Sequence, residues 1–496
     1  MEKIICRQLS FAYPKSEYQA LKNVDFSVEN GEFCLVIGKS AAGKSTLLKL
    51  MKKEIAPFGT LDGDIEIFGS VGYVAQNVEE NIVCDKVRGE LSFGLTNMGM
   101  HGEQIDLLVA ETASYFNLES KLDSDISSLS GGEKQMVNLA AVMIMKPDIL
   151  VLDEPTSQLD PVSSERFIQM IKRLHREFGI TVIISEHSLD NLFDSASKIL
   201  FIDNGVLKCN LAPDDAARFL RSYGGGIEKI VPVERRLFDN AKTVSECREI
   251  LKGKSLVQKP LVDEKTDIAA KIRALCFAYQ KGNDVLFNLS LNVYKGKINA
   301  VLGPNSSGKS TLLKAIAGVC KAHRGRIKAD GRVSMLCQNV YDLFTKESCG
   351  EEVEFGEITH YLGIDDIKER HPYDLSGGQA QRLALAKVLA MGADIILLDE
   401  PTKSFDCVLK STLGEILRDL CAQGKTILLV SHDIEFVGEY ADYVSFLSRG
   451  KIIGTRSRRE FFSSLNFYTT SVSKITKNIC ENVVSVDDLR DAGGIE

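Results

Sequence analysis

Gly38-Lys39-Ser40-Ala41-Ala42-Gly43-Lys44-Ser45-Thr46 follows the apolar residues 33–37, which predict a buried strand, and precedes residues 47–51, which predict a helix. A glycine-bounded loop in this position that ends in Gly-Lys-Ser is typical of a phosphate-binding loop. Its glycines let backbone N–H groups approach an anion, and the helix N-terminus favours negative charge. We expect Lys44 to reach the β- and γ-phosphates of a nucleotide and the Ser45 hydroxyl to bind Mg²⁺. The alternative is a loop that only turns the chain.

A second copy of this loop argues against that alternative. Gly303-Pro304-Asn305-Ser306-Ser307-Gly308-Lys309-Ser310-Thr311 follows another apolar run, residues 298–302. The residues expected to hold phosphate and its metal are Gly38, Ser40, Gly43, Lys44, Ser45 and Thr46 in the first copy and Gly303, Asn305, Gly308, Lys309, Ser310 and Thr311 in the second. The sequence therefore predicts that the protein binds two nucleoside triphosphates.

Length and composition limit the class of protein. The 496 residues are enough for roughly two to four domains of about 150 residues. The net charge of −8 gives no overall basic field for nucleic acid. The twelve cysteines form no CxxC pair, which is typical of reduced thiols in a cytosol. Neither a signal peptide nor an apolar run of about 18–20 residues is present, so we expect a cytosolic chain that reaches a membrane only through a partner.

The two halves of the chain are repeats of unequal length. Matching residues of the two copies are separated by more positions at the phosphate loops, from Lys44 to Lys309, than at the later motifs. Among the later motifs this separation is nearly constant. Most of the extra residues of the first copy lie between Gly94 and Ser130. The matching segment of the second copy, from Gly356 to Ser376, is shorter. We expect that about one helix and its turn are missing from the second copy.

Strands and helices alternate within each half, which predicts a parallel α/β core. Short alternating segments open each copy and predict additional strands. The expected organisation is a first cassette over residues 1–225, a linker over 226–268, a second cassette with a shortened helical part over 269–465, and a polar, poorly ordered tail over 466–496.

Paired carboxylates end one apolar run in each half. Asp153-Glu154-Pro155 follows residues 149–152, and Asp399-Glu400-Pro401 follows residues 395–398. Acids at the C-terminal edge of a buried strand lie where such sheets bind ligands. The first acid suits Mg²⁺ and the second suits a base that orients water toward the γ-phosphorus. An acidic strand end alone is commonly a helix cap, but a phosphate loop in the same half favours catalysis.

A serine followed by two glycines precedes each acid pair, at the same spacing in both halves. The two motifs are Leu129-Ser130-Gly131-Gly132 and Leu375-Ser376-Gly377-Gly378. Each could simply cap a helix, or its amides could approach a phosphate. With these motifs at this spacing, both halves resemble ATP-binding cassette ATPase domains. The resemblance implies an α/β fold of two tandem P-loop cassettes, each with a RecA-like parallel-sheet core, an antiparallel β subdomain and an α-helical signature subdomain.

The resemblance assigns roles to further residues. Tyr13 and Tyr279 match the aromatic residue that stacks on adenine, although lone strand tyrosines commonly serve packing. Gln76 and Gln338 match the glutamine that touches Mg²⁺ and water and senses a transmembrane partner. Together with Ser45, Asp153, Ser310 and Asp399, these glutamines are the expected metal ligands.

His187 and His432 match the histidine that contacts the γ-phosphate, so Glu154, His187, Glu400 and His432 are the expected catalytic residues. Ser157-Gln158-Leu159-Asp160 fits the D-loop of the family, whereas Ser404-Phe405-Asp406 has Phe where Leu is usual. Ala41 and Ser306 replace a middle glycine of the phosphate loops.

Cassettes of this family pair head to tail, which implies two shared ATP sites within this one chain. One site would combine Lys44 and Glu154 with 376–378, and the other would combine Lys309 and Glu400 with 130–132. Because each half keeps its glutamate and histidine, we expect both sites to hydrolyse ATP.

The segment QNVEENIVCDKVRGELSFGL, residues 76–95, resembles that of energy-coupling-factor importers of vitamins and transition metals. The resemblance implies a peripheral protein at the cytoplasmic face of a membrane, with a transmembrane coupling protein and a membrane substrate-binding subunit as partners and no direct nucleic-acid contact. Acidic residues could meet arginines of the coupling protein: Glu79, Glu80, Asp85, Glu90, Glu347, Glu351 and Glu352. The alternatives are a monosaccharide importer and a soluble tandem-cassette ATPase that acts on ribosomes or nucleic acid. No residue identifies the transported substance.

Overall fold

The computed structural model describes residues 2–14, 16, 18–187, 189, 192–238, 240–258, 267–280 and 282–495, except for the side chain of Glu80. The chain divides into two compact units, Met1–Pro232 and Val233–Glu496. Their boundary falls within the segment 226–268 that the sequence predicts to be a linker. Within the described ranges, no helix combines the length and the apolar character needed to span a membrane.

A six-stranded sheet forms the centre of the first unit, with the strand order β5-β6-β7-β3-β8-β9. The strands are β3 (Phe33–Ile37), β5 (Val71–Val74), β6 (Ile149–Asp153), β7 (Thr181–Ser185), β8 (Lys198–Asp203) and β9 (Val206–Leu211). All neighbours are parallel except β8 and β9. Every residue of β3, β6 and β7 is buried, as continuous apolar runs in a parallel sheet require. The predicted α/β core is therefore confirmed.

A smaller antiparallel sheet holds the N-terminal strands of the first unit, β1 (Glu2–Ala12), β2 (Gln19–Glu29) and β4 (Thr60–Ile67). Its buried side chains join one hydrophobic cluster with those of β3 and of α1 (Lys44–Leu50).

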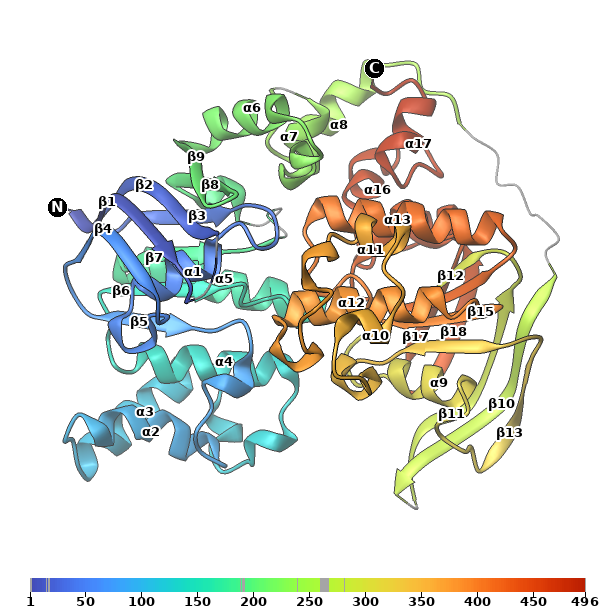
Figure 1. Cartoon of the computed structure of the whole chain (residues 1–496), viewed down its shortest axis with the longest axis horizontal. Helices are drawn as coiled ribbons and strands as arrows, with labels where there is room; N and C mark the ends of the chain where they lie inside the picture. The colour runs from blue at the N-terminus through green and yellow to red at the C-terminus, as the bar shows by residue number, and fades with distance from the viewer. Residues whose placement is uncertain are drawn as a thin grey trace. The chain divides into compact units, whose positions relative to one another are not determined.

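Helices complete the first unit. In Figure 1, α2 (Val87–Asn97), α3 (Glu103–Tyr115) and α4 (Gly131–Met143) lie together, with α2 in contact with both others. The remaining helices are α5 (Pro161–Phe178) and α6 (Pro213–Tyr223), and short 3₁₀ turns are η1 (Lys53–Ile55), η2 (Val78–Glu80), η3 (Glu119–Lys121), η4 (Ile126–Ser128), η5 (Phe193–Ser195) and η6 (Ile227–Ile230).

The second unit repeats both sheets. Its six-stranded sheet has the order β14-β15-β16-β12-β17-β18, and its three-stranded sheet has the order β11-β10-β13. The strands are β10 (Ile268–Gln280), β11 (Asn283–Tyr294), β12 (Ile298–Leu302), β13 (Arg324–Ala329), β14 (Val333–Leu336), β15 (Ile395–Asp399), β16 (Thr426–Val430), β17 (Tyr443–Ser448) and β18 (Lys451–Ser457). The principal helices are α9 (Lys309–Ile316), α12 (Gly377–Ala390), α13 (Cys407–Ala422), α14 (Ile434–Tyr440) and α15 (Arg458–Ser464), and the 3₁₀ turns are η7 (Val340–Leu343), η8 (Asp365–Ile367) and η9 (Pro372–Asp374).

The helical part of the second unit is shorter, but in a different way from the loss of one helix that the sequence suggested. Both of its first helices are present and both are short: α10 (Cys349–Glu352) and α11 (Glu357–Tyr361). Tyr115 at the end of α3 and Tyr361 at the end of α11 precede their signature serines, Ser130 and Ser376, by the same number of positions. The missing residues therefore come from the end of the first helix and the start of the second.

Residues from the expected linker and from the expected polar tail form one helical cluster in the second unit. Four helices contribute to it: α7 (Val233–Leu237), α8 (Val244–Lys252), α16 (Ser471–Thr476) and α17 (Val486–Asp491). Helix α16 contacts both α7 and α8. Leu251, Ile475 and Leu489 are each 0% exposed within their shared hydrophobic core. The tail is thus polar in composition but folded, in contrast to the expected poor order.

Candidate active site

The phosphate loop of the first unit lies between β3 and α1 and holds its lysine inward. Lys44 is 5% exposed, and its Nζ donates to the carbonyl oxygens of Gly38 at 3.0 Å and Lys39 at 3.1 Å. Gly43 has φ 102°, and a Cβ built there would lie 2.4 Å from the carbonyl oxygen of Ala20. Glycine at this position is therefore required by both conformation and space. The loop presents its lysine where a bound phosphate would replace the carbonyl contacts.

The second phosphate loop reproduces this geometry between β12 and α9. Lys309 Nζ donates to the carbonyl oxygens of Gly303 and Pro304, both at 2.9 Å. Gly308 also has φ 102°, in the left-handed region. The two loops are therefore equivalent in backbone and in the position of their lysine.

Asp153 at the end of β6 gathers three hydroxyl groups. Its Oδ1 accepts from Ser45 Oγ at 3.1 Å and from Ser185 Oγ at 2.8 Å, and its Oδ2 accepts from Tyr73 OH at 3.3 Å. Burial, and then the neighbouring Glu154, raise the pKa of Asp153. Ser45 and Asp153, two of the predicted metal ligands, are thus brought together. Tyr73 and Ser185 were not predicted as partners of Asp153, since neither belongs to a phosphate or acid motif.

Glu154 lies at the centre of the first site. Its Oε1 lies 2.7 Å from His187 Nε2 and 3.7 Å from Lys44 Nζ, and its Oε2 accepts from Gln76 Nε2 at 2.8 Å. Burial pushes the pKa of Glu154 upward, but the interactions with His187 and Lys44 outweigh burial and hold the pKa at about 2. The structure thus collects four residues that the sequence predicted from separate motifs.

The acid pair of the second unit differs in its contacts. Asp399 is 1% exposed at the end of β15, beside the hydroxyl group of Ser310. Burial raises the pKa of Asp399, although the neighbouring Ser310 and Lys309 oppose the rise. A buried carboxylate beside a serine hydroxyl offers the oxygen ligands that a divalent cation of the Mg²⁺ type prefers.

Glu400 pairs with its histidine but not with its glutamine. His432 Nε2 lies 3.2 Å from Glu400 Oε1, and the His432 backbone N–H donates to Glu400 Oε2 at 3.1 Å. Gln338 is exposed, and no described hydrogen bond joins it to Glu400. Burial raises the pKa of Glu400, with Lys309 opposing the rise. Among the described residues, Gln338 therefore lacks the contact with the glutamate that Gln76 makes in the first unit.

Each signature serine is the N-cap of a helix. Ser130 N donates to Glu133 Oε2 at 2.9 Å and Ser376 N donates to Gln379 Oε1 at 3.1 Å, in capping boxes that begin α4 and α12. Capping does not explain the glycines of the second unit. A Cβ built on Gly377 or Gly378 would meet no atom within 4 Å, so packing inside that unit leaves the space beside them open.

The two predicted adenine-stacking tyrosines are placed alike. Tyr13 OH lies 3.0 Å from Thr46 Oγ1, and Tyr279 OH lies 3.2 Å from Thr311 Oγ1. The two tyrosines are 41% and 60% exposed, respectively. Each tyrosine is therefore tied to its phosphate-loop helix while much of its ring stays open to a ligand.

The departures from the family pattern have structural explanations. Ala41 has φ 62° and Ser306 has φ 59°, so both occupy a left-handed conformation that glycine adopts more easily. Phe405 is 1% exposed and packs in the core of the second unit. Leu159, at the matching position of the first unit, is 8% exposed.

Two of the acidic residues expected to meet a coupling protein instead support their own loops. Glu90 Oε2 accepts from the backbone N–H groups of Val83 at 3.0 Å and Cys84 at 2.8 Å. Glu352, whose side chain is 0% exposed, pairs with Lys387 at 2.5 Å. The expectation was therefore wrong for Glu90 and Glu352, because their carboxylates are fully used inside the fold.

The other acids of that group are better placed for a partner. Asp85, Glu347 and Glu351 are exposed, and Glu79 is exposed but pairs with Lys134 Nζ at 2.6 Å. The side chain of Glu80 lies outside the described part of the chain.

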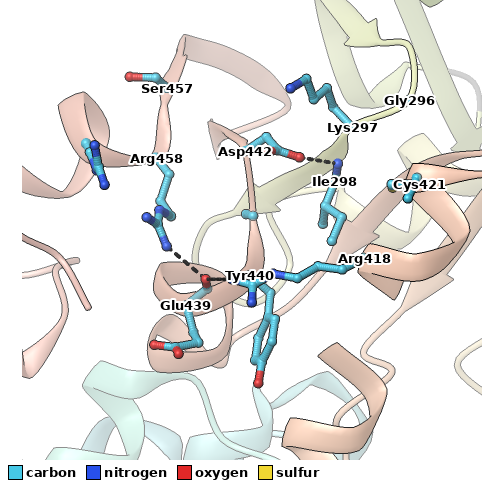
Figure 2. Close-up of a pocket in the computed structure, with 13 residues that line it drawn as sticks. Gly296, Lys297, Ile298, Arg418, Cys421, Glu439, Tyr440, Asp442, Ser457 and Arg458 are labelled. Atoms are coloured by element: carbon cyan, nitrogen blue, oxygen red, sulfur yellow. Dashed lines mark hydrogen bonds between the residues drawn. The ribbon is translucent and has the colours of Figure 1, made fainter. Parts of the chain in front are cut away.

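A cavity of about 420 Å³ in the second unit contains none of the predicted site residues (Figure 2). Its arginines are already bonded: Arg458 Nη1 donates to the carbonyl oxygen of Glu439 at 2.8 Å, and Arg418 Nη2 donates to the same oxygen at 2.9 Å. Asp442 Oδ2 accepts from the Ile298 N–H at 2.8 Å. These contacts join α13, α14 and β12 and give the cavity a structural role.

Two phosphate loops, each beside a strand that ends in paired carboxylates, define a P-loop ATPase with two cassettes. The model of the ABC transporter family matches residues 21–157 and 286–403. A Bacillus anthracis protein named a putative ABC transporter ATP-binding protein is 36% identical, over 98% of this chain and 97% of its own length. A Methanosarcina mazei protein with the same name is 31% identical, over 92% of this chain and 89% of its own. The chain belongs to the ABC transporter family, and it is an ATPase of that family.

Solved structures support the tandem fold. An archaeal ribosome recycling factor, solved in complex with a ribosomal stalk protein, gives a TM-score of 0.64 at 22% identity, over 92% of this chain and 91% of that one. A structure named RNase-L inhibitor gives a TM-score of 0.62 at 23% identity, over 92% of each chain. At this level of identity the likeness establishes the fold alone.

Proposed function

We propose that this chain is the ATP-hydrolysing, energy-coupling subunit of a membrane importer of the vitamin or transition-metal type. The observation that carries the proposal is that in each unit the glutamate contacts a histidine of the same unit and the phosphate loop holds its lysine inward. Relatives that span nearly the whole chain and are named as transporter ATP-binding proteins support a role in transport.

Each site is proposed to work with ATP and Mg²⁺. The chemistry supplied by a bound Mg²⁺ would be neutralisation of the charge that develops on the phosphates. Ser45, Asp153 and Gln76 are the residues proposed to hold the ion in the first cassette, and Ser310, Asp399 and Gln338 in the second. The backbone amides and lysine of each loop position the phosphates.

The glutamates act on the water in this proposal. Glu154 and Glu400 orient the attacking water, and His187 and His432 hold the glutamate and approach the γ-phosphate. The 2.7 Å contact between His187 and Glu154 supports this pairing of roles.

The signature residues are proposed to complete the opposite cassette's site. Lys44 and Glu154 would work with Ser376, and Lys309 and Glu400 with Ser130, as the two cassettes pair head to tail. The open space beside Gly377 and Gly378 supports this arrangement, since a phosphate could approach their amides.

The partners are proposed to be a transmembrane coupling protein and a membrane substrate-binding subunit, with the chain at the cytoplasmic face of the membrane. The segment that follows Gln76 and the exposed acids Asp85, Glu347 and Glu351 support a surface for basic side chains of the coupling protein.

The test is purification of the tagged full-length chain from detergent-solubilised membranes, with bound proteins identified by mass spectrometry. We expect a polytopic coupling protein and a substrate-binding membrane subunit. A variant with Glu347→Lys and Glu351→Lys should lose both proteins, while Glu249→Lys, which changes an exposed acid on α8, should keep them. Recovery of ribosomes or nucleic-acid proteins without any membrane protein would overturn the importer proposal and favour the alternative of a tandem-cassette ATPase that acts away from the membrane.

A further inference from the structure

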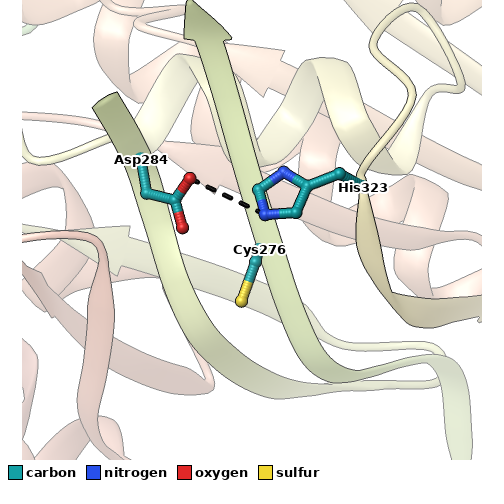
Figure 3. A group of neighbouring side chains, drawn as sticks. All are labelled: Cys276, Asp284 and His323. Carbon is teal, nitrogen blue, oxygen red and sulfur yellow. Dashed lines mark ion pairs between the residues drawn. The ribbon is translucent and has the colours of Figure 1, made fainter. Parts of the chain in front are cut away.

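Three side chains with metal-binding atoms meet on the three-stranded sheet of the second unit, among them a cysteine, an aspartate and a histidine (Figure 3). The ligand atoms of Cys276, Asp284 and His323 all lie within 4.8 Å of one another. None of the three belongs to the nucleotide site described above.

The sheet fixes this arrangement through its register. Cys276 lies on the central strand β10, Asp284 lies on β11, and His323 immediately precedes β13. Asp284 pairs with Ala278 of β10, two residues from Cys276 and so on the same face of the strand. The His323 backbone N–H donates to the Cys276 carbonyl oxygen at 3.2 Å. The backbone therefore holds one ligand from each of three adjacent strands in place.

The ligand types and the distance between His323 and Asp284 fit a tetrahedral zinc ion. Bonds of about 2.1 Å at tetrahedral angles place nitrogen and oxygen ligands about 3.4 Å apart. His323 Nε2 and Asp284 Oδ1 are 3.6 Å apart. Thiolate, imidazole and carboxylate are all common zinc ligands, whereas Mg²⁺ and Ca²⁺ prefer oxygen alone.

The surroundings suit a metal-bound thiolate with access from solvent. The Asn288 backbone N–H donates to Cys276 Sγ at 3.2 Å, which is the kind of outer contact that supports a sulfur ligand. Cys276 is only 9% exposed, but the side chains of His323 and Asp284 are 52% and 29% exposed. An ion can therefore enter from the side of the histidine, and a water can take a fourth position.

The first unit indicates that the sheet does not need these residues in order to fold. Strand pairing places Ser10, Gln19 and Leu61 of the first unit at the positions of Cys276, Asp284 and His323. The two sheets have the same strand order, yet only the second has a set of metal ligands among the described residues. A requirement of packing therefore does not explain the cluster.

We propose that Cys276, Asp284 and His323 bind one Zn²⁺ ion, with water as the fourth ligand, and that the ion clips β11, β10 and β13 of the second cassette together. Binding replaces the thiol proton of Cys276, which leaves to solvent. The site is separate from the Mg²⁺ site at Asp399.

The test uses the purified, EDTA-treated and desalted full-length chain without nucleotide, titrated with Co²⁺ as a spectroscopic probe and then with Zn²⁺ as competitor. We expect a thiolate-to-cobalt charge-transfer band in the near ultraviolet that saturates at one equivalent and is displaced by Zn²⁺. Cys276→Ser should remove this band. His323→Gln and Asp284→Asn, which alter more exposed side chains, should weaken zinc binding by at least about 10–100-fold, since even outer-shell losses cost that much.

Matched controls separate this site from adventitious binding. Cys320→Ser removes another thiol of the same unit, and His360→Gln disrupts a second His–Asp pair, in which Nδ1 of His360 lies 2.7 Å from Asp365 Oδ2. Both controls should bind Co²⁺ and Zn²⁺ like the unmodified chain. Unchanged binding in folded Cys276→Ser and His323→Gln, or loss of the band in Cys320→Ser, would overturn the proposal. Circular dichroism establishes that each variant is folded.

Discussion

Glu186 is a buried carboxyl group one residue before His187, the histidine proposed to act in the first cassette. It is 4% exposed, and its Oε1 accepts from the backbone N–H of Thr156 at 2.9 Å and from Thr156 Oγ1 at 2.7 Å. Burial raises the pKa of Glu186 to about 7, with the Thr156 hydrogen bonds opposing the rise. At neutral pH this group is therefore at the midpoint of its titration.

Because the pKa of Glu186 is raised in the folded chain, the free energy of unfolding falls as the pH rises. Between the unfolded pKa near 4.5 and the folded pKa near 7, the folded chain binds more protons than the unfolded chain. The contribution of Glu186 to the free energy of unfolding is therefore full below pH 4.5 and is lost as the pH rises through 7, by about 3 kcal/mol in all.

The variant Glu186→Gln keeps an acceptor oxygen for Thr156 but cannot ionise. We expect it to be more stable than the unmodified chain at pH 8 and to lose that advantage at pH 5. Thermal unfolding of both proteins at the two pH values measures the difference. An equal difference at both pH values would contradict the assigned shift.

At the scale of single elements, Glu352 on α10 anchors the preceding loop. Its Oε1 accepts from the Thr345 N–H and, at 2.6 Å, from the Lys346 N–H, while its Oε2 pairs with Lys387 on α12. A short helix of four residues is held in place by these contacts rather than by its own hydrogen bonds.

We expect Glu352→Gln to lower the free energy of unfolding by about 3 kcal/mol, because Lys387 keeps its charge in a largely buried place and loses its partner. Urea unfolding of the full-length chain measures the change. The adjacent variant Glu351→Gln, at an exposed position, is the control and should change stability by less than about 0.5 kcal/mol. Equal effects of the two substitutions would argue against the anchoring role.

The sequence predicted the positions of the motifs far better than the burial and contacts of individual side chains. Strand–loop–helix order located Lys44 and Lys309 and the acid pairs, because each depends on local pattern. Whether a carboxylate is buried depends on where a loop folds back: Glu90 and Glu352 belong to the same acidic segments as the exposed Asp85 and Glu351. The different contacts of Gln76 and Gln338 likewise follow from tertiary packing, which identical residue types do not reveal.

Short helices explain the other missed feature. Helices α16 and α17 have six residues each, too few for a clear hydrophobic period. Their apolar residues are buried because they pack against α7 and α8. These two helices precede the second cassette in the sequence, whereas α16 and α17 follow it. The sequence therefore predicted a linker and a tail where the structure has one shared core.

At the scale of the whole molecule, this core ties the segment between the cassettes to the C-terminal residues. Leu489 on α17 and Leu251 on α8 are both 0% exposed in the cluster. Leu489→Ala removes buried methyl groups and should cost about 2–5 kcal/mol locally. We expect faster amide hydrogen exchange in α8, with exchange in β15 unchanged.

The control for this variant is Val257→Ala, since Val257 is 66% exposed. Its exchange pattern should match that of the unmodified chain. Unchanged protection of α8 in Leu489→Ala would indicate that the linker helices fold without the C-terminal segment.

Both cassettes are proposed to contain a complete hydrolytic site. Glu154 and Glu400 each contact a histidine of their own unit, at 2.7 Å and 3.2 Å. The most direct measurement is steady-state phosphate release from ATP by Glu154→Gln, by Glu400→Gln and by the double variant, with ATP binding measured in parallel. We predict that each single substitution lowers turnover and that the double substitution lowers it by about 100-fold or more, while ATP still binds. Turnover unchanged in either single variant would contradict the claim and leave one hydrolytic site.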